Sequence, residues 1–143
     1  MGDRKQLKRK PVTEATIVYR VVGTSDLNSA LLEPYFRPED KPQEITAREK
    51  RYPELLDGIC VDSSIEQARI TLSNMRKAAS RDGESEKWQD GCIAEVVLQP
   101  DQGFDHENRK KSHGKQTIWG DSTNLAGAVC RLHQADDRMT GED

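Results

Sequence analysis

Three groups of residues in this chain combine types and positions that suit recognition of a nucleotide sugar. Arg20 lies in the middle of one apolar run, and Glu95 lies in the middle of another. Ser63 and Ser64 stand where a short apolar run gives way to a helical pattern. A guanidinium and the amino end of a helix both bind phosphate oxygens, and a carboxylate binds a ribose hydroxyl or stabilises an oxocarbenium ion. This interpretation requires that Arg20, Ser63 and Glu95 converge in one cleft, within about 10 Å of each other.

Each of these residues also has an ordinary structural explanation. Arg20 and Glu95 can form an ion pair across neighbouring strands, which needs no ligand. Ser63 and Ser64 are preferred residues at a helix N-terminus, where a side-chain oxygen accepts a hydrogen bond from a free backbone N–H. The sequence leaves both explanations open.

The elements that position these residues are two strong strands and one helix. Residues 15–22 and 92–98 are rich in β-branched and apolar residues and predict strands, as does the shorter run 58–62. Ser63 and Glu66 have the spacing of a capping box, and an apolar stripe from Ile65 to Ala79 predicts a helix.

Shorter elements are expected elsewhere. Ser25 or Asp26 caps a short helix that ends at Pro34, and residues 117–119 predict a brief strand. Asp121 is placed to cap another helix, and the spacing over 128–132 fits either the end of that helix or a last strand. The four prolines of segment 34–53 predict a long loop.

The length of 143 residues and mass of 16.1 kDa fit one domain. We expect residues 1–14 to be a basic disordered tail and residues 15–133 to form a single α+β domain. Residues 134–143 are expected to be a polar acidic tail. We expect a mostly antiparallel sheet flanked by two or three helices.

The order of Tyr19-Arg20 on a strand, Gly58 to Ser64 before a helix, and the strand that carries Glu95 resembles the small ADP-ribosyltransferase-like domains. The resemblance implies an enzyme that uses NAD and modifies a macromolecular target. By this resemblance Arg20 and Ser63 or Ser64 bind NAD, and Glu95 is the catalytic carboxylate.

A second hypothesis is a non-catalytic module that binds an unknown protein through an aromatic surface patch. Its candidate residues are Trp88, His113 and Trp119, because aromatic residues dominate binding hot spots. Core packing is the alternative role of the tryptophans, above all of Trp119.

Charge and composition argue against several other classes. The net charge of -3 argues against nucleic-acid binding except through the basic tail or the run 109–111. No apolar run is long enough for a membrane helix and no secretory pattern is visible, so a cytoplasmic location is expected. Cys60, Cys92 and Cys130 are expected to be reduced structural residues, and the spacing of histidines and cysteines predicts no metal site.

Overall fold

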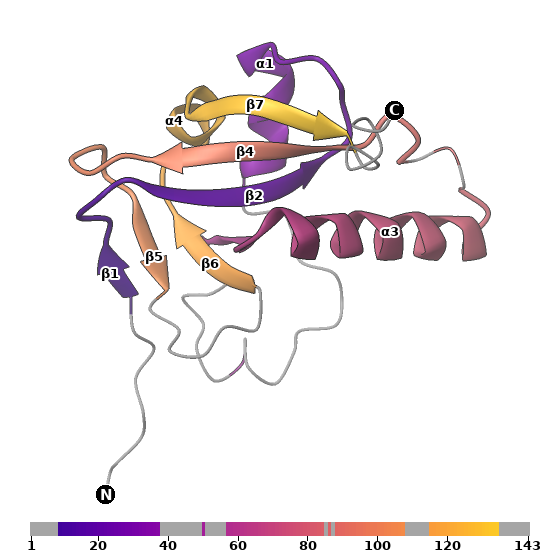
Figure 1. Cartoon of the computed structure of the whole chain (residues 1–143), viewed down its shortest axis with the longest axis horizontal. Helices are drawn as coiled ribbons and strands as arrows, with labels where there is room; N and C mark the ends of the chain where they lie inside the picture. The colour runs from indigo at the N-terminus through magenta and orange to yellow at the C-terminus, as the bar shows by residue number, and fades with distance from the viewer. Residues whose placement is uncertain are drawn as a thin grey trace, which may run out of the picture.

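A seven-stranded antiparallel sheet organises the protein (Figure 1). The computed structural model describes residues 9–37, 50, 57–84, 86, 88–107 and 115–134. In spatial order the strands are β1 (Arg9–Pro11), β5 (Asp105–Glu107), β6 (Lys115–Trp119), β3 (Ile59–Asp62), β2 (Thr16–Val22), β4 (Cys92–Leu98) and β7 (Val129–Gln134). The helices of the described residues are α1 (Ser29–Leu32), the 3-10 helix η1 (Glu33–Phe36), α3 (Ile65–Arg81) and α4 (Ser122–Gly127). The predicted α+β class, with a mostly antiparallel sheet and a few helices, is confirmed.

The larger hydrophobic core lies between one face of the sheet and the helices α1, η1 and α4. Alternate residues of a strand point to the same face, so Val18 and Val22 of β2 enter this core together with Ala94 and Val96 of β4. The helices contribute fully buried side chains to it: Leu32, Phe36 and Leu125.

The opposite face of the sheet is covered in part by α3. Ala68 and Leu72 on one side of this helix pack against Val21 of β2 and Ile93 of β4. Figure 1 shows α3 beside the end of β2, and Ile17 near the beginning of that strand remains 48% exposed. Among the described residues, α1, η1 and α4 therefore cover one face of the sheet, while α3 covers only part of the other, which we call the half-open face.

Two helix starts differ from the sequence prediction. Ser64, not Ser63, caps α3, because its extended backbone lets its hydroxyl accept a hydrogen bond from the Gln67 N–H. Asn28, not Ser25 or Asp26, caps α1. Pro34 does not end the helical segment. It lies in the first turn of η1, where the backbone N–H that proline lacks would have no partner within the helix.

The domain begins earlier in the chain than the sequence predicts. Residues 9–11, assigned to a disordered tail, form β1 and pair with β5, and Val12 is buried in the core. The charged sequence of β1 has no local pattern typical of a strand, since this strand depends on pairing with β5, which lies far along the chain. Strand β7 likewise continues one residue beyond the expected end at residue 133. Most of the basic tail, the proline-rich loop beyond residue 37 except Lys50, and the run 109–111 lie outside the described residues.

Candidate functional site

Arg20 is a structural link between three elements. Its side chain leaves β2 on the face of the larger core, between Val18 and Val22. Nε donates a hydrogen bond of 2.8 Å to the main-chain oxygen of Tyr35 in η1, and Nη1 donates to the main-chain oxygen of Cys60 in β3. The guanidinium therefore joins η1 and β3 to the central strand.

Glu95 lies on the opposite face of the sheet. The register pairs Arg20 with Ala94 and Tyr19 with Glu95, and residues opposite each other on antiparallel strands share a face. Ala94 is in the larger core with the neighbours of Arg20, while Glu95 faces the side of α3. The predicted convergence of Arg20 and Glu95 in one cleft is therefore wrong, and so is the alternative of an ion pair between them.

Ser63 and Ser64 do not complete a pocket with either residue. Ser64 is occupied as the cap of α3, while Ser63 is exposed and accepts a long hydrogen bond of 3.5 Å from Gln116 Nε2. Two surface cavities of the described part of the chain, of about 360 and about 300 Å³, are lined by none of the four predicted residues. NAD binding stays a prediction from the resemblance, without a shared cleft to support it.

Glu95 instead belongs to a polar cluster that the sequence did not reveal. His133 of β7 donates through Nε2 to Glu95 Oε1 at 2.7 Å, because a carboxylate can only accept. The Cys130 thiol donates to Glu95 Oε2 at 3.5 Å, and the Tyr19 ring lies 6.2 Å from the His133 ring. We call these four residues, Tyr19, Glu95, Cys130 and His133, the Glu95 cluster.

A bulge in β7 brings Cys130 to this cluster. The register pairs Glu95 with Arg131 and Val96 with Val129, so Cys130 is an extra residue without an opposite partner. The sequence left residues 128–132 open between helix and strand, which is why neither Cys130 nor His133 was predicted as a neighbour of Glu95. The alternation of Arg131 and His133 would have suggested a strand face, but nothing local shows that β7 pairs with β4.

The charges of the Glu95 cluster oppose nucleophilic chemistry at its thiol. The hydrogen bond from His133 is the main cause that lowers the pKa of Glu95 below its ordinary value. Partial burial and the hydrogen bond to Glu95 raise the pKa of Cys130, so this thiol stays protonated at neutral pH. Burial and the nearby Glu95 charge also raise the pKa of Tyr19. The cluster is a carboxylate that accepts hydrogen bonds from His133 and Cys130, with the Tyr19 ring beside His133.

Replacing Glu95 with Gln is expected to lower the free energy of unfolding by about 1 kcal/mol at pH 7, because a carboxamide accepts hydrogen bonds less strongly than a carboxylate. The pKa of Glu95 is depressed in the folded protein, so its contribution is present above the unfolded value, about pH 4.3, and disappears as pH falls through the folded value. Urea unfolding of both proteins between neutral pH and about pH 3 measures this difference. The exposed Glu14→Gln variant controls for the loss of one negative charge. A difference for Glu95→Gln that does not shrink in acid contradicts this account.

The two tryptophans proposed as surface anchors have different environments. Trp119 is 4% exposed, and the Arg9 guanidinium stacks over its ring at 4.5 Å from the centroid. Its role is packing, so its assignment to a surface patch is wrong. Trp88 is half-buried against the smaller core beneath α3, and its ring lies close to Gly23. The third candidate, His113, lies outside the described residues.

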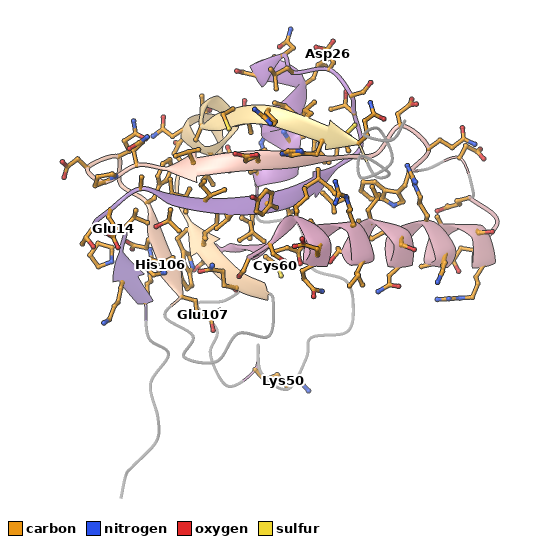
Figure 2. All side chains as sticks on the ribbon, viewed as in Figure 1. Glu14, Asp26, Lys50, Cys60, His106 and Glu107 are labelled. Atoms are coloured by element: carbon orange, nitrogen blue, oxygen red, sulfur yellow. The ribbon has the colours of Figure 1, made fainter. Side chains whose placement is uncertain are left out.

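All three cysteines lie in the part of the chain that the structure describes. Cys60, Cys92 and Cys130 are free thiols, of which Cys92 alone is buried. Figure 2 shows Cys60 where β3 lies beside β6. No group of three or more His, Cys, Asp or Glu residues in the described ranges is arranged to hold a metal ion. No helix in the same ranges is long and apolar enough to cross a membrane.

The site geometry therefore separates the residues that the family resemblance brought together. Arg20 donates hydrogen bonds to main-chain oxygens, and Ser64 accepts one at the N-terminus of α3. Glu95 accepts hydrogen bonds from His133 and Cys130. Comparison with protein-family models, with curated proteins and with solved structures finds no significant match.

Proposed function

We propose that this protein is a non-catalytic binding module that takes up an extended segment of a partner protein along the outer edge of β7. The observation that carries the proposal is the difference between the two edges of the sheet. Edge strands expose unpaired main-chain groups, and proteins commonly protect them with short strands, charges or proline. A strongly protected edge on one side and a less protected edge on the other favours the second as a docking surface.

The β1 edge has these protective features. It is three residues long and consists of Arg9, Lys10 and Pro11. The edge strand β7 is six residues long, contains neither lysine nor proline, and is bordered on one side only by β4 among the described strands. Its bulge at Cys130 affects the beginning of the strand and leaves residues 131–134 in regular register with β4.

The main-chain groups that a peptide would meet follow from the register. Val97 of β4 donates its N–H to the Ala128 oxygen just before β7, so the odd-numbered residues of β4 direct their main-chain groups toward β7. Their partners Arg131 and His133 consequently face β4. The N–H and C=O groups of Leu132 and Gln134 point away from the sheet, where an added strand can pair with them.

The side chains along this edge favour a particular kind of segment. Arg131 lies beside Glu95 on the half-open face of the sheet. Its side chain is exposed and has no ion-pair partner among the described residues. An acidic side chain of the peptide complements this charge. Leu132 points to the other face, where it packs against the larger core. The occupant is therefore an extended peptide of β-forming residues with an acidic residue placed beside Arg131.

Selection of random displayed peptides on the full chain, followed by affinity measurement with the synthetic peptides, tests the proposal. We expect binders with an acidic residue, and loss of at least about tenfold in affinity when alternate peptide amides are N-methylated, because each lost main-chain hydrogen bond costs about 0.5–1.5 kcal/mol. Hydrogen exchange should show new protection at Leu132 and Gln134.

A matched pair of variants tests the edge itself. Gln134→Pro removes one outward N–H, and proline is tolerated on an edge strand at such a position, so the fold should persist while peptide affinity falls several-fold. Gln134→Ala removes the side chain but keeps the N–H and should bind normally. Peptides that bind Gln134→Pro and the parent equally, or that protect residues away from β7, would falsify the proposal.

A further inference from the structure

A polar cavity of about 300 Å³ lies beyond the end of β2 and the beginning of β4. It is open to solvent, and Figure 1 shows that β2, β4, β7 and α3 approach one another in this part of the protein. Its volume is at the lower end of the range for small-molecule sites and is too small for a dinucleotide. The lining residues are Ser25, Arg76, Gln89, Asp90, Gly91, Cys92 and Gln134.

The guanidinium of Arg76 is held in a fixed orientation in this cavity. Nε donates to the main-chain oxygen of Trp88 at 3.0 Å, and Nη2 donates to the main-chain oxygen of Gln89 at 3.3 Å. A guanidinium has five N–H donors, so three remain for a ligand. Because the side chain is half-buried and already ordered, a bound anion does not pay for ordering it.

Asp90 brings the opposite charge to the same cavity. The positive charge of Arg76 and the negative charge of Asp90 both act on the Cys92 thiol, whose pKa is raised mainly by burial. Arg76 works against this increase and Asp90 adds to it, so both charges lie close to one thiol on the cavity wall. The two residues, both described, form no ion pair with each other.

We propose that this cavity binds a small zwitterion of the α-amino acid class, with its carboxylate against Arg76 and its ammonium group against Asp90. Arginine is suited to carboxylates because two parallel N–H groups match the two oxygens. The hydroxyl of Ser25 and the amides of Gln89 and Gln134 are polar groups of the wall, which favour a polar side chain in the ligand. This site shares Gln134 with the outer edge of β7, but its two charged contacts are Arg76 and Asp90, so the proposal does not depend on peptide binding at β7.

Calorimetric titration of the full chain with each of the common amino acids tests the proposal. We expect at least one polar amino acid to bind, and its methyl ester and its N-acetyl derivative to bind at least about tenfold more weakly, because each lacks one charge. Acetate and methylammonium, which carry one charge each, should not bind detectably. Acetate that binds as well as the amino acid would indicate a simple anion site and overturn the proposal, as would the absence of any binding at about 10 mM ligand.

Variants link the binding to the two charges. Arg76→Lys keeps the charge but loses the double hydrogen bond, and Asp90→Asn keeps the shape but loses the charge; each should weaken binding at least about tenfold. Arg76 also holds the main chain at Trp88 and Gln89, so Asp90→Asn is the decisive variant if Arg76→Lys unfolds. Glu86→Gln removes an exposed acidic side chain of the same loop outside the cavity lining and should bind normally. Equal affinity of Asp90→Asn and the parent rules out the assigned site.

Discussion

Replacement of Arg20 with Leu is expected to lower the free energy of unfolding by about 4 kcal/mol. The change removes two hydrogen bonds from a charged donor and leaves the main-chain oxygens of Tyr35 and Cys60 without this donor. Hydrogen bonds to charged groups contribute about 1.5–3 kcal/mol each, and an acceptor left unsatisfied adds a desolvation cost. Chemical denaturation followed by circular dichroism measures the loss.

Two further substitutions distinguish this structural role from a role in ligand binding. Arg20→Lys keeps the positive charge but cannot reach two oxygens in different directions, so it should recover only part of the stability. Arg37→Met removes another arginine, which forms an exposed ion pair with Glu33, and should leave stability nearly unchanged. If Arg20→Leu were as stable as the parent protein, the guanidinium would not connect η1 and β3, and its role in anion binding would regain support.

The same residue shows how far the sequence determines the site. The strands that carry Arg20 and Glu95 were predicted within one residue of their observed bounds, because β-branched residues and a following Gly or Pro mark them locally. The register between the two strands is not local. Tyr19 rather than Arg20 lies opposite Glu95, and this offset of one residue places the two charged side chains on opposite faces. A family resemblance based on the order of residues along the chain does not contain that information.

Long-range pairing also explains the other errors in the fold. The helix α3 was predicted because its apolar stripe and caps are local signals. The edge strand β1 and its neighbour β5 are not predicted, because both are short and polar and they pair with each other across a long stretch of sequence. Strand β7, which supplies His133 and Cys130 to the Glu95 cluster, is ambiguous in the sequence for a related reason. Its short pattern also fits a helix, and only its pairing with β4 distinguishes the two.

The second large effect is expected at Gly58, where substitution by Ala should lower the free energy of unfolding by about 3 kcal/mol. A Cβ atom at this position would lie 2.5 Å from Thr117 Cγ2, 2.8 Å from the main-chain oxygen of Ile118 and 2.9 Å from Trp119 Nε1. Glycine is needed here because β6 passes too close for a side chain, not because of an unusual backbone angle. Ile118 is paired with Ile59 in the sheet, so its oxygen can move only if β3 and β6 separate.

A matched glycine and a compensating change make this prediction specific. Gly127→Ala at the end of α4 meets no atom within 4 Å and should leave stability unchanged or raise it by about 0.5 kcal/mol. Adding Thr117→Ser to Gly58→Ala removes the methyl group that makes the closest contact, while the Ile118 oxygen remains, so the double variant should recover part of the loss. Thermal unfolding of the four proteins measures both effects. A loss for Gly127→Ala equal to that for Gly58→Ala would show that the cost comes from replacing glycine in general and not from the close approach of β6 to β3.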